Sequence, residues 1–220
     1  VGIDNVNADI ILGLPESNES FMQTVENVCK LPLTHVSMYA LELYPETPLW
    51  QRRNECTTDS DRLADLYDMA VKRLAKGGFA RYETSNFARD GKQCRHNLNY
   101  WREGRYYGFG ASASGFVVDT RYTDVRDIND YIAADNLREE EQTVSPDEQA
   151  NEYVMLALRL TEGVCLTTFT ERYGSDFWHY FANARQLQSQ GFLQQVGDSV
   201  TIPDDKVYVA NSILAELLNI

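Results

Sequence analysis

The amino-acid sequence predicts an α/β fold for its N-terminal part, followed by a small winged-helix-like α+β domain. Strand-like and helix-like segments alternate through residues 1–90, which is typical of parallel strands joined by helices. Residues 91–134 are rich in Gly, Tyr and Arg, and residues 135–220 combine short helical patterns with a β-hairpin. The expected domains therefore span 1–90, 91–134 and 135–220.

The first ninety residues contain three expected strands and two expected helices. The strands are expected at 8–12, 36–41 and 81–87, and the helices at 20–31 and from Asp59 to Gly77. This β-α-β-α-β order with short loops predicts parallel strands. Because active sites of such sheets lie at the carboxyl ends of the strands, we expect a site near Gly13, Glu42 and residues 85–88.

The C-terminal part begins with a strong helix-start signal. Ser145-Pro146-Asp147-Glu148 combines an N-cap serine, a proline in the first turn and the glutamate of a capping box, which predicts a helix to about Leu160. Further helices are expected at 167–174, 176–190 and 206–218, and a hairpin at 193–202 around Gly197-Asp198. Three helices and a hairpin indicate a winged-helix-like module, preceded by an acidic, solvated stretch at 135–152.

Composition and charge exclude several classes of protein. The 220 residues are 43% apolar and carry 20 Lys and Arg against 33 Asp and Glu, a net charge of −13. Wholesale disorder does not fit this composition, and no apolar run reaches the roughly 18 residues of a membrane span. Because phosphate binding needs clustered Lys and Arg, we expect no nucleic-acid partner, even for the winged-helix-like module. A soluble, cytoplasmic protein is expected.

The four cysteines and the first residues point to reduced thiols and to a partial chain. The spacing of Cys29, Cys56, Cys94 and Cys165 contains no C-x-x-C pair, so a self-contained zinc or iron–sulfur ligand set is not expected. The sequence has no initiator Met or secretory signal and enters a strand within ten residues. We therefore expect it to begin partway through a larger protein.

A short segment holds most of the candidate chemistry. Residues 89–105 contain five basic side chains against Asp90 and Glu103, a net charge of +3 within an acidic chain. The five are Arg89, Lys92, Arg95, Arg102 and Arg105. Such an island suits a carboxylate or phosphate ligand, because charge-assisted bonds to Arg are strong. A solvated loop explains the charge equally well.

His96 is the candidate metal ligand of this segment. It stands near Tyr100 and Trp101, so its imidazole could ligate a haem iron while arginines meet the propionates. A hydrogen-bonding loop histidine is the alternative. His35, which precedes a strand, and His179, among helical aromatics, have weaker claims. The Gly-rich run at 104–115 does not match a dinucleotide-binding fingerprint.

Four motifs resemble those of one protein family. They are Asp9-Ile-Ile-Leu-Gly-Leu-Pro15, Tyr82-Glu-Thr-Ser-Asn-Phe-Ala88, His96-Asn-Leu-Asn-Tyr-Trp101 and the run Gly-Phe-Gly-Ala-Ser-Ala-Ser from Gly108. In this order they resemble the HemW haem chaperones, relatives of oxygen-independent coproporphyrinogen III oxidase among the radical S-adenosylmethionine proteins. The resemblance implies the latter part of a radical-SAM-type partial (β/α) barrel followed by the winged-helix-like domain.

The resemblance also implies roles for individual residues. His96 would ligate haem iron, with Arg95, Asn97, Tyr100 and Trp101 around the haem. Asp9 would contact the ribose of S-adenosylmethionine, and the strand end near Glu42 would serve the same cofactor. No catalytic residue is implied. The expected function is haem binding and delivery to a client haemoprotein, and the alternative is oxidative decarboxylation of coproporphyrinogen.

Two departures from the family pattern matter. The Cys-x-x-x-Cys-x-x-Cys motif that holds the 4Fe-4S cluster is missing from this sequence, so the chain alone is expected to be inactive in radical chemistry. The cluster and S-adenosylmethionine would belong to the full-length protein. Ser114 stands where the family commonly has a histidine. Missing strands would leave an open sheet edge beside residues 8–12, which predicts self-association unless a loop covers it.

Overall fold

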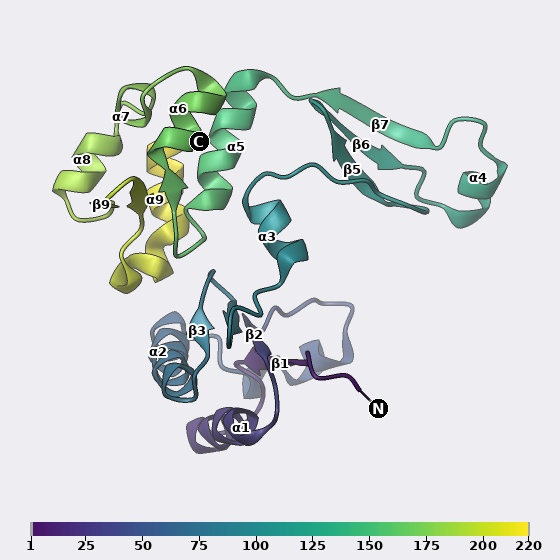
Figure 1. Cartoon of the computed structure of the whole chain (residues 1–220). Coiled ribbons are helices and arrows are strands. Elements are labelled where there is room, and N and C mark those ends of the chain that lie inside the picture. The colour runs from purple at the N-terminus through teal and green to yellow at the C-terminus, as the bar shows by residue number, and fades with distance from the viewer. Residues whose placement is uncertain (1, 220) are drawn as a thin grey trace. The chain divides into compact units, whose positions relative to one another are not determined.

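The computed structural model describes residues 2–219, which form two compact units that divide between Cys94 and Arg95 (Figure 1). Each unit has its own hydrophobic core. Among the described residues, no helix is long and apolar enough to cross a membrane.

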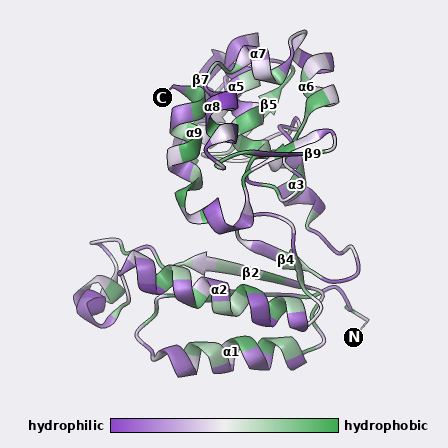
Figure 2. Cartoon of the chain, turned by 90° about the vertical axis from the view of Figure 1, so that its left-hand side faces the viewer, coloured by the Kyte–Doolittle hydropathy of each residue, from purple (hydrophilic) through white to green (hydrophobic). Residues whose placement is uncertain are grey.

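The first unit is a four-stranded sheet covered on one face by two helices. Its elements are β1 (Asn7–Leu12), α1 (Asn18–Lys30), β2 (His35–Ala40), the 3-10 segment η1 (Pro48–Glu55), α2 (Ser60–Lys76), β3 (Ala80–Arg81) and β4 (Asn86–Ala88). Figure 2 shows α1 and α2 side by side along the sheet. Ser17 and Asp59 cap the two helices by accepting backbone N–H groups, and Gly77 ends α2.

The sheet differs from the expected all-parallel arrangement. Strands β1 and β2 are parallel, as predicted, but β4 is antiparallel to both β2 and β3, and the strand order is β1-β2-β4-β3. The prediction of a single third parallel strand over 81–87 was therefore wrong. The Glu83 carboxylate accepts the Ser85 N–H at 2.9 Å and also the side-chain amide of Asn86. These bonds hold a reverse turn, so the segment doubles back into a hairpin.

The second unit contains helix α3 (Arg95–Trp101), a three-stranded arm and a helical domain. The arm consists of β5 (Ser114–Val117), β6 (Thr120–Asp124), α4 (Ile128–Ala133) and β7 (Arg138–Thr143), with the sheet order β5-β6-β7. Figure 1 shows the arm extending away from α5 and the other helices of this unit. The sequence predicted neither α3 nor β7.

The helical domain follows the predicted order with local differences. Its elements are α5 (Pro146–Ala157), β8 (Val164–Cys165), α6 (Leu166–Tyr173), α7 (Phe177–Tyr180), α8 (Ala184–Ser189), β9 (Gln194–Val196), β10 (Ser199–Thr201), the 3-10 segment η2 (Asp204–Val209) and α9 (Ala210–Leu218). The capping box of Ser145 and Glu148 and the hairpin β9–β10 are confirmed. The single helix expected over 176–190 is broken into α7 and α8, because Phe181 takes an extended conformation that keeps its ring in the core.

Candidate functional site

Helix α3 presents His96 to solvent. Leu98 is the buried residue of this short helix, and His96 and Arg95 on other faces are exposed. Across residues 2–219, neither ring nitrogen of His96 has a hydrogen-bond partner. A ring nitrogen with a free lone pair on an exposed helix is the form of histidine that can ligate a metal.

Two tyrosines hold the His96 ring in place. The rings of His96 and Tyr100 meet edge to face with centroids 4.8 Å apart, and Tyr100 meets Tyr106 in the same way at 4.7 Å. Edge-to-face packing orients an aromatic ring while leaving its in-plane nitrogens accessible. This row of three rings therefore positions the imidazole without occupying its nitrogens.

The five residues expected around haem all lie on α3 but do not share one face. His96 and Tyr100 are four residues apart and therefore lie one above the other on the helix, as do Asn97 and Trp101, which are half-buried on the next stripe. Arg95 is exposed at the first position of the helix. The helix thus offers one ligating face with a cation beside its start.

Much of the basic island has a structural role. Arg89 donates to the carbonyl oxygens of Cys29 at 3.0 Å, Gly77 at 3.0 Å and Leu33 at 3.3 Å, and its guanidinium lies 3.9 Å from the ring centroid of Phe79. These bonds join the ends of α1 and α2 within the first unit. Arg89 is therefore committed to the fold rather than available to an anionic ligand.

Arg102 and Arg105 also have bonding partners within the protein. Arg102 forms a two-bond ion pair with Glu162 at 2.9 and 3.1 Å, and Arg105 donates to the Glu103 carbonyl at 3.0 Å and to the Gln149 side chain at 2.7 Å. Within the described chain, this leaves Lys92 and Arg95 as the members of the island whose side chains have no ion pair or hydrogen bond. The expectation that the whole island meets an anion is corrected accordingly.

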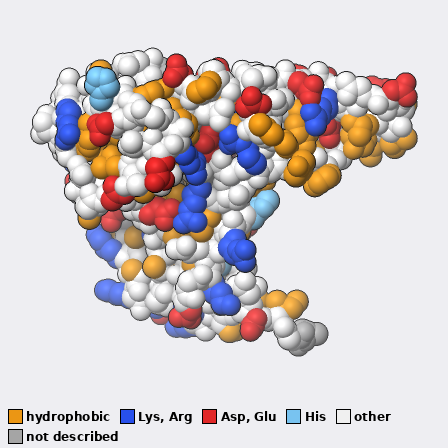
Figure 3. All heavy atoms as spheres, turned by 45° about the horizontal axis from the view of Figure 1, so that its top comes forward, with side chains coloured by type: hydrophobic (Ala, Val, Ile, Leu, Met, Phe, Trp, Pro, Cys, Tyr) orange, Lys and Arg blue, Asp and Glu red, His pale blue; other side chains and the backbone are white. Residues whose placement is uncertain are grey.

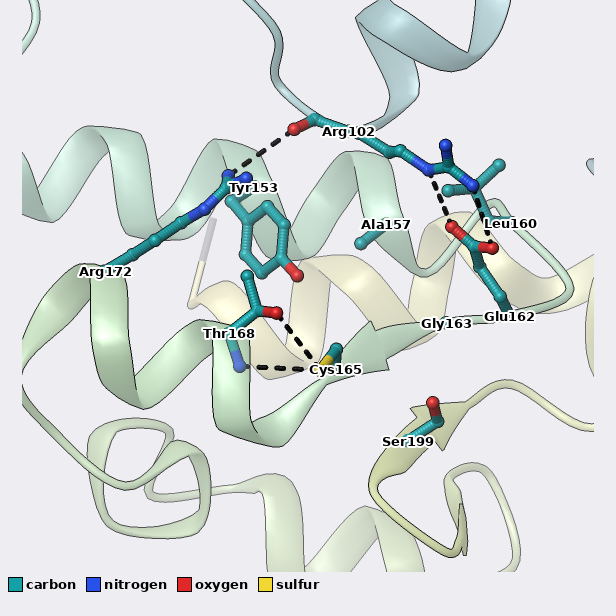
Figure 4. Close-up of a pocket in the computed structure, with 10 residues that line it drawn as sticks. All are labelled: Arg102, Tyr153, Ala157, Leu160, Glu162, Gly163, Cys165, Thr168, Arg172 and Ser199. Atoms are coloured by element: carbon teal, nitrogen blue, oxygen red, sulfur yellow. Dashed lines mark hydrogen bonds and ion pairs between the residues drawn. The ribbon is translucent and has the colours of Figure 1, made fainter.

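A cavity of about 360 Å³ lies behind Arg102 in the second unit (Figure 4). Tyr153, Ala157 and Leu160 give it an apolar side, and Cys165 accepts hydrogen bonds from the Thr168 backbone and hydroxyl. The charged side chains of its rim are paired, because Arg102 bonds Glu162 as described above and Arg172 lies 3.6 Å from Glu103. The cavity therefore offers no free charge to a ligand.

Glu103 fastens the C-terminal end of α3 to the helical domain. It has a positive φ of 56° and is buried. Its carboxylate accepts the Tyr173 hydroxyl at 3.1 Å and lies 3.6 Å from Arg172 and 3.8 Å from Arg105. Burial raises the pKa of this carboxyl group above its usual range, and the Tyr173 bond and the two arginines oppose that rise. The contacts fix where α3, and hence His96, sits on its own unit.

A second group of candidate residues lies on the polar face of the first unit's sheet. Strand alternation places Asn7 and Asp9 of β1, His35 and Ser37 of β2 and Asn86 of β4 on one face, opposite the residues packed on α1 and α2. The Oδ1 atom of buried Asn86 has no hydrogen-bond partner among the described residues. An unpartnered buried acceptor on the same face as exposed Asp9 fits a face that receives a polar ligand.

A hydrogen-bonded chain crosses this polar face. The Nδ1 atom of His35 is 2.7 Å from Asn7 Oδ1, and its Nε2 atom is 2.8 Å from the Tyr82 hydroxyl, which accepts the Cys94 N–H at 3.2 Å. Because the Asn7 amide nitrogen donates to Asp9, Oδ1 faces His35 and can only accept. Nδ1 therefore carries the proton, and Nε2 accepts from Tyr82. This role of His35 was missed from sequence.

Asp9 and Glu42 are both exposed in the first unit. Asp9 lies within β1, opposite Ser37, and not at the carboxyl end where the sheet argument placed the site. Glu42 follows β2 and accepts the Tyr44 hydroxyl. The Asp9 carboxylate is thus accessible to a hydroxyl-bearing ligand, which fits the ribose role that the resemblance implies for it, and Glu42 is exposed at the strand end that the resemblance assigns to the same cofactor.

The residues present do not fit an iron–sulfur cluster. The free cysteines are dispersed over both units, and no group of three or more His, Cys, Asp or Glu side chains in residues 2–219 is arranged to hold a metal ion. A cluster of this kind needs several thiolates together. No chemical step of this chain is therefore assigned to one.

The chain has similar proteins along nearly its full length. Residues 144–204 match the family model of the HemN C-terminal domain. "Heme chaperone HemW" of Lactococcus lactis is 31% identical and that of Mycobacterium tuberculosis 33%, each over 99% of this chain, and the Escherichia coli HemW is 30% identical over 97%. The resemblance to the HemW family is confirmed. The chain spans 59%, 56% and 58% of these three relatives.

The fold matches that of part of one solved structure. The structure of coproporphyrinogen III oxidase (HemN) from Escherichia coli, described as a radical SAM enzyme, matches with a TM-score of 0.77 at 17% identity. The match covers 96% of this chain and 54% of that protein. Both units of this HemW-like chain therefore have counterparts in a mixed α/β radical SAM structure.

Proposed function

We propose that this chain is the haem-binding part of a HemW-like chaperone that delivers haem to a client haemoprotein. The observation that carries the proposal is the exposed His96 imidazole, which has no hydrogen-bond partner among the described residues and is oriented by Tyr100. Similarity over almost the whole chain to curated haem chaperones supports it. Haem enters here as cargo, so no catalytic residue is assigned.

The individual roles are those that the resemblance implies, and the geometry of α3 supports them. His96 ligates the iron, Tyr100 orients the ring, and Arg95 meets a propionate from the start of the helix. Trp101 and Asn97 border the haem from the adjacent stripe. In the full-length protein, Asp9 and Glu42 contact S-adenosylmethionine, which together with the 4Fe-4S cluster supplies radical chemistry in proteins of this fold.

The finer architecture is part of the same proposal. Residues 1–90 correspond to the last β/α units of a radical-SAM-type barrel, 91–134 to a haem-binding segment and 135–220 to a winged-helix-like domain without a nucleic-acid role. We place the protein in the cytoplasm. The β1 edge of the sheet, which has no neighbouring strand within residues 2–219, favours self-association.

The second candidate function is oxidative decarboxylation of coproporphyrinogen, which the fold of HemN favours. The two functions separate in the full-length protein. An oxidase converts coproporphyrinogen and consumes S-adenosylmethionine, whereas a chaperone binds haem without product release. Product formation by the full-length protein would therefore overturn the chaperone proposal.

A haemin titration followed by absorbance tests the proposed site in this chain. The wild-type chain is expected to show saturable binding with a shifted Soret band, and His96→Ala to weaken binding at least about tenfold, as expected for a lost iron ligand. His179→Ala is the matched control, because His179 is also exposed but lies on α7. Equal loss in both variants, or no loss in either, would contradict the assignment, provided that circular dichroism shows folded proteins.

A further inference from the structure

The arm of the second unit ends in a strand with an open edge. In the sheet order β5-β6-β7, the outer side of β5 is bridged by Tyr106, whose backbone exchanges two 2.9 Å hydrogen bonds with Phe116. In the part of the chain that the structure describes, nothing pairs with the outer side of β7, and all six of its residues are exposed. An edge of this kind can receive another strand.

The hydrogen bonds between β6 and β7 show which backbone groups of β7 point away from the sheet. The Val144 N–H donates to Asp119 at 2.8 Å, and the register pairs Gln142 with Arg121. Because bonding alternates along an antiparallel pair, Glu140 and Gln142 bond toward β6. The N–H and C=O groups of Glu141 and Thr143 therefore face away from the sheet. They form two donors and two acceptors at the spacing that an added strand requires.

A groove of about 550 Å³ accompanies this edge. It is lined by β7, by Tyr122 of β6 and by the β5–β6 turn. The guanidinium of Arg138 lies 4.0 Å from the ring centroid of Tyr122 and forms one wall. Val118 in the turn is 75% exposed and has a positive φ of 58°, which is strained for a β-branched residue. The strained turn presents an apolar side chain beside the open edge.

The charge of the arm indicates which kind of strand can pair with β7. Residues 114–143 carry eight Asp or Glu and three Arg, a net charge of −5. Glu139, Glu140 and Glu141 are consecutive on the edge and form ion pairs with Arg126 and Arg138 of the same arm, so a partner meets the surplus negative charge of the arm rather than a free glutamate. Figure 3 shows acidic and hydrophobic side chains exposed together on the arm. A second copy of β7 would place like charges opposite each other, which disfavours self-pairing. A basic strand matches the edge instead.

We propose that β7 is a docking edge for an extended, Lys- or Arg-containing segment of a partner protein. The segment adds to the sheet as a fourth strand through the outward groups of Glu141 and Thr143, and an apolar side chain of the segment packs on Val118. Backbone pairing provides affinity, and the acidic side chains provide selectivity and fast association. This surface works independently of haem at His96.

Fluorescence anisotropy with a labelled peptide of about eight alternating Lys and Val residues tests this edge. Thr143→Pro removes one outward N–H without changing a charge and is expected to weaken binding at least about fivefold. Thr143→Val keeps the N–H and is expected to bind like the wild type. Replacing Glu139, Glu140 and Glu141 together by Gln is expected to weaken binding about tenfold and to reduce its salt dependence.

Two further measurements keep the proposal falsifiable. A peptide of the same sequence that is N-methylated at alternate amides keeps its charge but cannot pair, so it is expected not to bind. The proposal would be wrong if the methylated peptide bound as tightly as the unmethylated one, or if the Thr143→Pro variant bound the peptide as tightly as the wild type. Either result would mean that the contact is nonspecific charge attraction. Absence of saturable binding, or a dimer in sedimentation that Thr143→Pro abolishes, would overturn it as well.

Discussion

The Tyr82 hydroxyl donates a hydrogen bond to Nε2 of His35 across 47 positions of sequence, at a distance of 2.8 Å. Both side chains are buried, and desolvation raises the pKa of Tyr82 to about 12. The hydroxyl also accepts the N–H of Cys94, the residue directly before α3. The polar face that carries Asp9 is thereby bonded to the chain segment from which the His96 helix begins.

Removing this hydroxyl is expected to destabilise the protein. Tyr82→Phe leaves the buried Nε2 of His35 and the Cys94 N–H without a partner, which costs about 1–3 kcal/mol of the free energy of unfolding. Tyr107→Phe is the control, because Tyr107 is 67% exposed. Urea unfolding of both variants measures the difference. Equal stabilities of the two variants would mean that the bond contributes nothing.

The burial of His35 predicts a pH dependence. Desolvation lowers its pKa below the ordinary 6.5, and nearby Asp9 opposes that shift. The unfolded chain therefore takes up a proton at His35 at a higher pH than the folded chain does. The contribution of this residue to the free energy of unfolding is fully present above pH 6.5 and is lost as the pH falls below it. His35→Gln is expected to flatten the decline, measured as thermal midpoints from pH 5 to pH 8, which bracket the histidine range. His179→Ala, at an exposed site, should leave the slope unchanged.

Glu103 predicts a pH dependence of the opposite sign. Burial raises the pKa of its carboxyl group above the ordinary 4.5. The folded chain then holds a proton that the unfolded chain releases, so this contribution is complete below pH 4.5 and is lost as the pH rises through the folded-state pKa. Relative to Glu103→Gln, the wild type should lose stability as the pH rises from 4.5. Parallel stability curves for the two proteins would show that Arg105 and Arg172 cancel the effect of burial.

Substitutions in the basic island are expected to affect stability differently at structural and at exposed positions. Arg89→Ala removes three bonds to carbonyl oxygens and is expected to cost about 2–4 kcal/mol of stability. Arg89→Lys should restore little, because an ammonium group lacks the planar fork. Arg95→Ala, at an exposed site, should change stability by less than about 0.5 kcal/mol. Chemical denaturation of the three variants checks this order, and a rescue by Lys would contradict it.

Local sequence signals predicted much of the fold. The Asp59 cap and Gly77 stop bound α2 closely, the Ser145 capping box begins α5, and the Gly197-Asp198 turn joins β9 and β10. Each of these depends on residues within a few positions of one another. The β3–β4 hairpin was missed because the Glu83 bonds that close it involve polar side chains without a hydrophobic pattern.

Strand β7 and the surroundings of His96 show the same limit of local sequence patterns. β7 contains no apolar residue, so no periodicity marks it, and it is a strand because it pairs with β6. His96 was identified from its motif, but its orienting ring row includes Tyr106, which lies beyond the end of α3. Contacts made by tertiary packing leave no short-range signal. The haem role of His96 stays a prediction that the titration tests.

The three carbonyls served by Arg89 also constrain how relatives of this chain can diverge. Cys29 lies in the last turn of helix α1, Leu33 in the turn between α1 and β2, and Gly77 in the turn after α2, and one planar guanidinium donates to all three carbonyl oxygens. A substitution at position 89 would leave acceptors without a donor in each turn at once, and no single compensating mutation could repair them. Evolution at these turns is therefore expected to be coupled, with the arginine lost only in lineages where the turns are rebuilt together.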